Sequence, residues 1–307
     1  MKFSKWLALL TSLVMLLTLA SSAVAERPGL EAPRAGEVVI DGDLSEWDMT
    51  KTLKVVEQSQ ITDQLEHWDG EDDCAMEVAV MWDENYLYFA VIISDADPFV
   101  YREGFPLDEL DAIIFFLSTN PDADPARTEY EATDWRWTIS VENYYGDWFN
   151  YIDRSMLADD KGYMTIGEWG DSNLFNGDCW DSDEAEAMVA DLVAACEAAG
   201  VSYEAAFTET QLEKDENGEV VTYEGAIYEI RLPLAFLSNE NIPVLTPAAG
   251  MTVGFDFSIL DVDLPCPGIH SLRLQYSAEL TATGGRTPDM HDADNNPSLW
   301  TTLTFVD

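Results

Sequence analysis

Short runs of β-branched and aromatic residues, separated by Gly, Pro, Asp or Asn, recur along most of this chain. Such runs favour strands, and the residues between them favour turns. A run at 76–81, the turn residues 83–85 and a second run at 86–93 are typical of an antiparallel hairpin. Further strands are expected at 112–117, 135–141, 226–232, 252–259, 271–276 and 299–305. Many strands without alternating helices predict an all-β fold, an Ig-like antiparallel β-sandwich, rather than a doubly wound α/β sheet.

One α-helix is expected inside a long insertion. Residues 181–184 provide an N-cap with an acid three positions later, apolar residues then recur at helical spacing as far as Cys196, and Gly200 ends the pattern. Several glycines occur between residue 150 and the start of this helix, so we expect an insertion over about 150–200 on one edge of the sandwich. Asn217-Gly218 predicts the tip of a hairpin. With no repeat and no linker, residues 26–307 are expected to form one domain.

The first 25 residues have the pattern of a secretory signal peptide. Lys2 and Lys5 form a basic start, residues 6–20 are an apolar run, and Ala23-Val24-Ala25 is a small-x-small cleavage site. No Cys follows that site, and no later run approaches the roughly 18 apolar residues that a spanning helix needs. We therefore expect a secreted, extracellular protein without membrane insertion.

The charge of the chain excludes polyanionic partners. The sequence has 59 Asp and Glu against 15 Lys and Arg, a formal net charge of -44. Loss of Lys2 and Lys5 with the signal peptide leaves 13 basic residues against the same 59 acids, or -46. Such a surface cannot neutralise many phosphates, so nucleic acid is not an expected partner. A hydrophobic content of 47% still predicts a large core rather than disorder.

Four cysteines in an exported chain favour two disulfides. The predicted helix holds Cys179 and Cys196 on the order of 20 Å apart, which is too far for a bond between them. Two pairings then stay open: Cys74 with Cys179 and Cys196 with Cys266, or Cys74 with Cys196 and Cys179 with Cys266. The alternative is that Cys196, on the apolar face of the helix, is a buried thiol.

Several segments of the chain together resemble family 9 carbohydrate-binding modules. Ile40-Asp41-Gly42-Asp43-Leu44-Ser45-Glu46-Trp47 and the hairpin at 80–89 carry the most specific likeness. Four later runs also resemble segments of the family and occur in the same order: the Asp-led run at 110–116, the amphipathic run at 228–234, and the runs at 254–261 and 297–305. The likeness spans residues 38–307 apart from the insertion.

This resemblance implies an Ig-like sandwich, structural calcium, and a site that holds sugar ends between two tryptophans. A sugar-contacting arginine of the family falls on Arg136, within Trp135-Arg136-Trp137. The two sandwiching tryptophans would fall near Asp108 and Asp294, and Ile114 replaces a contacting carboxylate.

Aromatic residues in loops are the candidates for a replacement sugar platform, because sugars present flat C–H faces. Trp135 and Trp137 lie on the strand face opposite Arg136 and are expected in the core, as are Trp47, Trp82 and Trp300. Candidate ligand-binding residues, besides Arg136, are Tyr101, Phe105, Trp148, Trp169, Trp180 and His291.

The most calcium-like segment is Asp292-Ala293-Asp294-Asn295-Asn296, whose alternate oxygen ligands match half of a calcium loop. Asp292, Asp294 and Asn296 are the candidate metal ligands, although Pro297 replaces the usual Gly. Asp122 with Asp124 and Asp261 with Asp263 form similar alternating pairs. No zinc spacing occurs among the His and Cys residues.

Together these features predict a secreted, non-catalytic protein that binds polysaccharide or oligosaccharide. It would support polysaccharide breakdown by glycoside hydrolases, acting on glycans in trans with those enzymes. One alternative is a glycoside hydrolase that cleaves O-glycosyl bonds with two carboxylates, although no other catalytic motif is present. A second alternative is a haem-binding sandwich, for which the adjacent Met290 and His291 are the available ligands.

Overall fold

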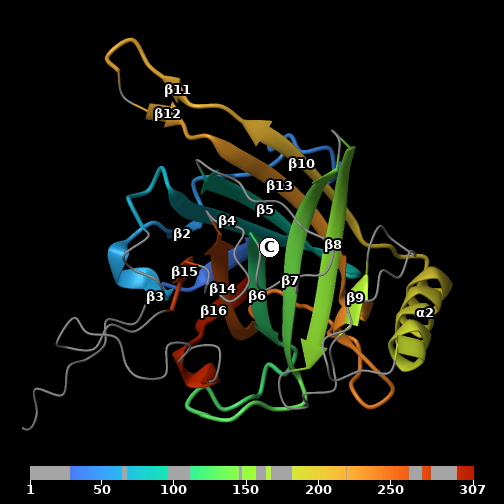
Figure 1. Cartoon of the computed structure of the whole chain (residues 1–307). Coiled ribbons are helices and arrows are strands. Elements are labelled where there is room, and N and C mark those ends of the chain that lie inside the picture. Colours follow the sequence, from blue (N-terminus) through green and yellow to red (C-terminus); the bar gives the residue numbers. More distant parts are fainter. Residues whose placement is uncertain are drawn as a thin grey trace, which may run out of the picture.

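The computed structural model describes residues 28–63, 68–95, 111–144, 147–156, 164–166, 182–218, 220–262, 272–277 and 296–307. Two sheets pack face to face, and a two-stranded arm projects beyond them (Figure 1). The protein is an all-β sandwich, as the strand pattern predicts. The expected signal peptide lies outside the described residues.

The larger sheet has nine strands in the order β1-β16-β14-β6-β7-β8-β9, with β15 attached to β14 and β3 attached to β15. All of its described pairings are antiparallel except that of β1 with β16. Its strands are β1 (Leu30–Pro33), β3 (Ile61–Asp63), β6 (Ala112–Ser118), β7 (Asp134–Tyr144), β8 (Asp147–Met156), β9 (Met164–Ile166), β14 (Thr252–Asp261), β15 (Leu272–Gln275) and β16 (Thr301–Val306).

The smaller sheet has five antiparallel strands in the order β10-β13-β5-β4-β2. They are β2 (Leu53–Val55), β4 (Cys74–Trp82), β5 (Tyr86–Asp95), β10 (Glu204–Thr210) and β13 (Gly225–Pro233). Between β10 and β13 the chain forms the projecting arm, β11 (Glu213–Lys214) and β12 (Val220–Thr222). Its tip is the predicted Asn217-Gly218 turn, where Gly218 has a φ of 86° that side chains rarely adopt.

All of the predicted strands are present, because each run alternates or is continuously apolar over a strand length. Only the ends of the strands differ from the predicted bounds. The last strand begins at Thr301 rather than 299 because residues Pro297–Leu299 form a 3-10 turn, capped by the Asn296 side chain. Within the predicted insertion, β8 and β9 continue the large sheet, and β8 pairs with β7 from Asp147 to Met156.

The core lies between the two sheets and is rich in aromatic rings. Phe89 of the small sheet packs on Phe115 and Trp137 of the large sheet, with ring centroids 4.6 and 5.8 Å away. Trp135 and Trp137 are 0% exposed, so the prediction that this face of β7 is core is confirmed. The expected burial of Trp47, Trp82 and Trp300 is confirmed as well.

The segment 40–47 is anchored to the small sheet by one buried carboxylate. Glu229 on β13 is 0% exposed and accepts hydrogen bonds from the backbone N–H groups of Asp41 and Gly42 and from the Trp47 indole N–H. Gly42 has a φ of 79°, and a Cβ there would meet Thr208 Oγ1 at 2.7 Å. The motif Ile-Asp-Gly at 40–42 therefore has a packing role, which is to cover the outer face of the small sheet.

The predicted helix is confirmed as α2 (Ser182–Ala199), which lies beside β9 at the edge of the large sheet (Figure 1). It ends where Gly200 takes a φ of 71°. Leu192 and Cys196 on its apolar face are buried in the main core. No helix among the described residues is long and apolar enough to cross a membrane.

The expected disulfides of Cys74 and Cys196 are wrong. Both side chains are buried thiols, which agrees with the alternative for Cys196 and contradicts both open pairings. Cys74 begins β4 with its side chain among core residues, where apolar neighbours rather than a second sulfur surround it. Burial, followed by the negative charge of Asp261, raises the pKa of the Cys74 thiol well above its ordinary value. Cys179 and Cys266 lie outside the described residues.

Replacing Glu229 with Ala is expected to lower the free energy of unfolding by about 3 kcal/mol or more, because three donors, two of them in buried hydrogen bonds, lose their acceptor. Urea denaturation followed by tryptophan fluorescence measures this loss. Glu31→Ala, on the exposed side of β1, is the matched control and should change the free energy by about 0.5 kcal/mol or less. Equal stabilities of the two variants would contradict the anchoring role of Glu229.

The Cys74 thiol is expected to resist alkylation in the folded protein, because it is inaccessible and its raised pKa leaves little thiolate. Iodoacetamide labelling at pH 8 with peptide mass mapping should show Cys74 modified only after denaturation. Rapid modification of Cys74 in the native protein, or its recovery in a disulfide-linked peptide, would contradict this expectation.

Candidate functional site

The face of the large sheet that points away from the core carries an unusual set of polar side chains. Because side chains alternate along a strand, the core positions Phe115, Trp137 and Phe257 place their neighbours on this outward face. Its members are Ala112, Ile114 and Phe116 on β6, Arg136 and Thr138 on β7, Asp256, Ser258 and Leu260 on β14, and Arg273 and Gln275 on β15. We call this set the outward face.

Two arginines on the outward face, Arg136 of β7 and Arg273 of β15, donate hydrogen bonds to hydroxyl groups on the same face. In one row across the sheet, Thr138 pairs with Ile114, and Ile114 pairs with Ser258. The Nη2 atom of Arg136 donates to Thr138 Oγ1 at 3.5 Å, and that of Arg273 donates to Ser258 Oγ at 3.2 Å. The two guanidinium groups therefore lie on opposite sides of Ile114.

A second polar group lies beside Arg273. Asp256 is 0% exposed and accepts hydrogen bonds from Gln275 Nε2 at 2.9 Å and from the Ser277 backbone N–H at 3.2 Å. Within the described part of the chain, the Gln275 Oε1 and Ser277 Oγ atoms are buried without a hydrogen-bond partner. Buried polar atoms are nearly always satisfied in proteins, so each of these oxygens is expected to have a partner that the described residues do not supply.

Aromatic residues border the polar part of the outward face. Phe116 packs against Trp300 with ring centroids 5.6 Å apart, and Tyr130 packs against the same indole at 5.9 Å. The loop that carries Tyr130 is held by Arg127, whose guanidinium donates two hydrogen bonds to the buried Asp134 carboxylate. The face thus combines fixed hydrogen-bonding groups with a neighbouring apolar surface.

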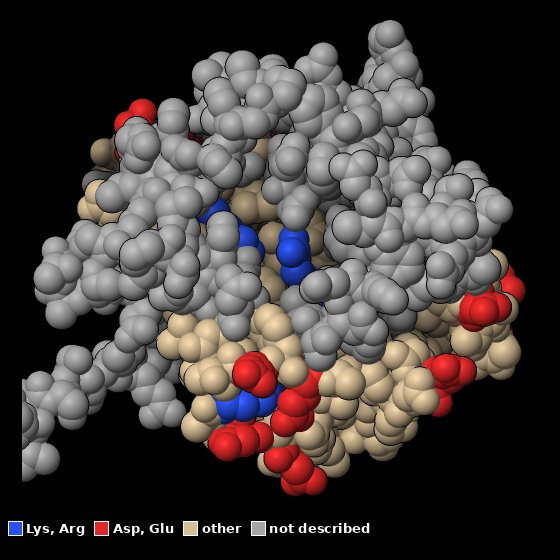
Figure 2. Space-filling model, turned by 60° about the horizontal axis from the view of Figure 1, so that its bottom comes forward, with Lys and Arg blue, Asp and Glu red and all other residues tan. Residues whose placement is uncertain are grey.

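The surface view shows where basic groups gather. In Figure 2, Lys and Arg side chains are visible near the middle of the view and again in its lower part, where acidic side chains lie around them. Arg273 is only 6% exposed, and Arg136 is partly buried. Two arginines, Arg136 and Arg273, and one buried carboxylate, that of Asp256, therefore lie on this face of the sheet.

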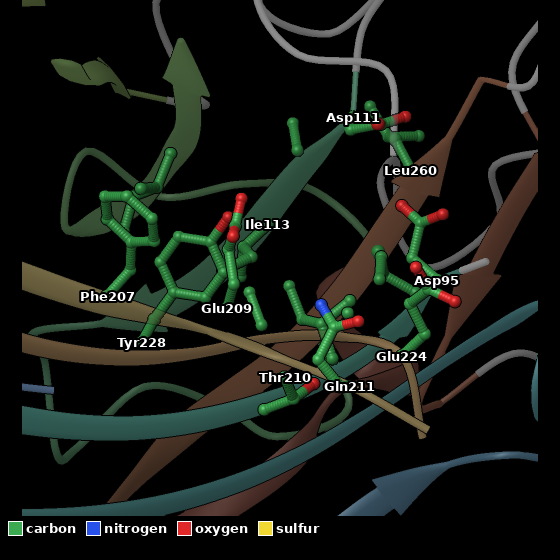
Figure 3. Close-up of a pocket in the computed structure, with 16 residues that line it drawn as sticks. Asp95, Asp111, Ile113, Phe207, Glu209, Thr210, Gln211, Glu224, Tyr228 and Leu260 are labelled. Carbon is green, nitrogen blue, oxygen red and sulfur yellow. The ribbon is translucent and has the colours of Figure 1, made fainter. Parts of the chain in front are cut away.

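A second, acidic site lies at one end of the sandwich, between the two sheets. It is a pocket of about 820 Å³, including its open mouth, bordered by β6 and β14 on one side and by β10 and β13 on the other. Figure 3 shows the rings of Phe207 and Tyr228 side by side on one wall, with Asp95 and Asp111 toward the other. Burial, followed by the charge of Asp111, raises the pKa of the Tyr228 hydroxyl.

Three carboxylates converge beside this pocket. Asp95 ends β5, Asp111 immediately precedes β6 and Asp261 ends β14, and one oxygen of each lies within 4.8 Å of the others. Asp95 is 6% and Asp261 is 2% exposed, and Asp111 Oδ1 also accepts a hydrogen bond from the Val262 N–H at 2.8 Å. Like charges so close together and so deeply buried raise the free energy of the protein unless a proton or a cation neutralises them.

The structure places only some of the predicted ligand-binding residues. Arg136 points to the outward face, as the alternation of β7 predicts. Trp148 lies on β8 opposite Asn143, but its side chain is outside the described residues. The remaining predicted residues fall outside the described part of the chain: Tyr101, Phe105, Trp169, Trp180 and His291.

The predicted calcium loop is mostly undescribed, and its described member has another role. Asp292 and Asp294 lie outside the described residues, as do Met290 and His291 of the haem alternative. The Asn296 side chain accepts from the backbone N–H and the hydroxyl of Ser298, so it caps the 3-10 turn before β16. The group that does converge is Asp95, Asp111 and Asp261, of which only Asp261 was named beforehand, in the alternating pair with Asp263.

Some residues of these two sites were not predicted from the sequence, although the sequence carries a recognisable pattern for them. Arg273 and Gln275 alternate with Leu272 and Leu274 in a predicted strand, which is the pattern of a half-polar face. The three converging aspartates stand at the ends of three predicted strands. Which strand ends meet depends on the topology, so their convergence could not be read from spacing.

Comparison with known proteins gives distant structural likenesses. No family model and no curated protein matches the chain. Among solved structures, it is similar to a family 9 carbohydrate binding module from Caldicellulosiruptor kristjanssonii in complex with cellotriose, with 15% identity and a TM-score of 0.46 over 90% of this chain and 93% of that one. The same kind of module in complex with glucose gives 14% identity and a TM-score of 0.45, over 90% and 95%.

Proposed function

We propose that this protein binds carbohydrate without cleaving it, and that the outward face around Arg136 is the binding site. The observation that carries the proposal is the arrangement of that face. Hydrogen-bonding groups from β7, β14 and β15 surround apolar residues of β6 on the side of the sheet that does not form the sandwich core.

This arrangement matches the chemistry of a sugar. A pyranose has a fringe of hydroxyl groups, each of which donates and accepts hydrogen bonds, and apolar C–H faces. Arg136, which is partly exposed, would supply donors to the hydroxyls, while Arg273, Gln275 and Ser277 lie buried on the same side of the sheet, near the apolar Trp300 cluster. The resemblance of the motifs at 40–47 and 80–89 to family 9 modules supports the same class of ligand.

The proposed setting is extracellular. The signal-peptide pattern at 1–25 supports export, and the acidic composition keeps such a protein soluble. By the resemblance, the protein would support polysaccharide breakdown by glycoside hydrolases that act in trans on the same glycan.

The proposal includes a structural calcium ion held by Asp95, Asp111 and Asp261. Oxygens bound to one calcium lie about 2.4 Å from the ion and so up to about 4.8 Å from each other, which the three carboxylates satisfy. Their donor set is all oxygen, as calcium prefers, and no basic residue is among the described residues that line the adjacent pocket. The ion would join β5 of the small sheet to β6 and β14 of the large sheet.

Sugar binding at the outward face is expected to depend on Arg136. Isothermal titration with glucose, cellobiose, xylose and xylobiose, with and without calcium, should detect binding by the wild type. Arg136→Ala should weaken it about tenfold or more, because a charged donor to the sugar is lost.

Arg34→Ala is the matched control and should bind like the wild type, because Arg34 pairs with exposed Glu84 and lies over Trp82, away from the outward face. An Arg136→Ala variant that binds as tightly as the wild type would show that the site lies elsewhere. Absence of heat with every sugar, confirmed on a glycan array, would contradict carbohydrate binding itself.

Calcium is expected to raise the thermal midpoint, with a stabilisation of about 2.7 kcal/mol when free calcium is 100 times its Kd. Asp261→Asn should abolish this shift. In EDTA the same variant should be at least as stable as the wild type, because it removes one of three adjacent negative charges. Differential scanning calorimetry measures both effects.

Asp122→Asn, in an exposed loop, should keep the full calcium shift. A calcium shift in Asp261→Asn equal to that of the wild type would contradict the assigned ligands.

A further inference from the structure

We propose that the pocket between the two sheets binds a protonated primary amine attached to a six-membered ring. The ring would lie on the aromatic wall of the pocket, and the ammonium group would lie between Glu209 and Glu224. This pocket is separate from the outward face, so the inference does not depend on the proposed carbohydrate site.

The small sheet carries carboxylates toward the pocket, on the side that elsewhere forms the core. Phe207 of β10 pairs with Tyr228 of β13, and Glu209 lies two residues beyond Phe207 on the same face. Ile230, two residues from Tyr228 on β13, belongs to the main core, so this face points toward the large sheet. Glu209 and Glu224 both line the pocket and are exposed there. Acidic side chains thus replace core residues at this end of the sandwich.

The inner part of the pocket is apolar and fits a ring. The rings of Phe207 and Tyr228 lie side by side on one wall, with centroids 6.1 Å apart (Figure 3). The pocket, about 820 Å³ with its open mouth, is in the size range of small-molecule sites. Four isoleucines of the main core, or packed against it, also line the pocket: Ile93, Ile113, Ile139 and Ile259.

The charge of the pocket favours a cation. Asp95, Asp111, Glu209 and Glu224 line it, and none of its described lining residues is basic. Aromatic faces also attract cations, so the wall and the carboxylates favour the same charge. A calcium ion at Asp95, Asp111 and Asp261 would leave Glu209 and Glu224 to the ligand.

The two glutamates are placed to share one ammonium group. Glu209 pairs with Ala226 across the strands, and Glu224 is two residues from Ala226 along the chain. Such diagonal neighbours lie about 7–8 Å apart, and long side chains span that distance. A primary ammonium has three N–H donors, so it can donate to both carboxylates, whereas a hydroxyl has one donor and no charge.

The test compares probes that differ in charge but not in shape. Isothermal titration of the mature protein at pH 7 in calcium buffer would use benzylamine and benzyl alcohol. We expect benzylamine to bind about tenfold more tightly or better, because its bonds to the carboxylates are charge-assisted. Glucosamine against glucose repeats the comparison on a sugar ring. An amine preference in either pair supports the proposal, and the pair that shows it identifies an amino sugar or an apolar amine as the ligand.

Variants locate the preference in the pocket. Glu209→Gln and Glu224→Gln should each weaken benzylamine binding about fivefold or more and leave benzyl alcohol binding unchanged, because the amide keeps the shape and loses the charge. Glu213→Gln is the matched control. It removes the same charge from the exposed arm, outside the described lining of the pocket, and should bind benzylamine like the wild type. Circular dichroism and the thermal midpoint verify that each variant is folded.

Three results would overturn the inference. The first is equal affinity within both probe pairs, which removes the preference for an amine. The second is an amine preference that survives unchanged in both glutamate variants, which removes the assignment to this pocket. The third is an amine preference seen only in EDTA, which would place the amine at the three aspartates in competition with calcium. Sugar binding that depends on Arg136 is measured separately, so the proposed function can hold or fail on its own.

Discussion

The contact of Phe89 with Phe115 and Trp137 joins the two sheets. It also fixes which side chains of the large sheet point into the core and which point away from it. Once these rings face inward, alternation forces Ile114, Phe116 and Arg136 to the other side of the large sheet. The position of the candidate sugar site is thus a consequence of core packing. Shifting β7 by one residue would exchange Arg136 with a tryptophan and lose both the core and the site.

Three acidic side chains meet at the ends of strands from both sheets. Asp95, Asp111 and Asp261 converge where β5 ends, β6 begins and β14 ends. Because these strands come from both sheets, a cation among the carboxylates would stabilise the packing of one sheet on the other. The pocket beside them is likewise lined by strands of both sheets.

Burial, rather than cross-linking, stabilises the described part of the fold. Cys74 and Cys196 are packed as apolar side chains in the main core, and Glu229 connects the segment at 40–47 to β13 through hydrogen bonds alone. A domain of this size buries enough apolar surface to fold without disulfides. The expectation of disulfides came from the export signal and an even number of cysteines, and neither reports where a thiol lies in the core.

The sequence by itself determined the strands, the helix and the face on which Arg136 lies, because the periodicity of apolar residues depends only on residues close together in the sequence. It also indicated that Trp135 and Trp137 belong to the core. Only the tertiary structure decided that Arg273 and Ser258 stand across β6 from Arg136, and that Asp95, Asp111 and Asp261 converge. These residues are far apart in the chain, and their meeting depends on the order and register of strands, which no local spacing specifies.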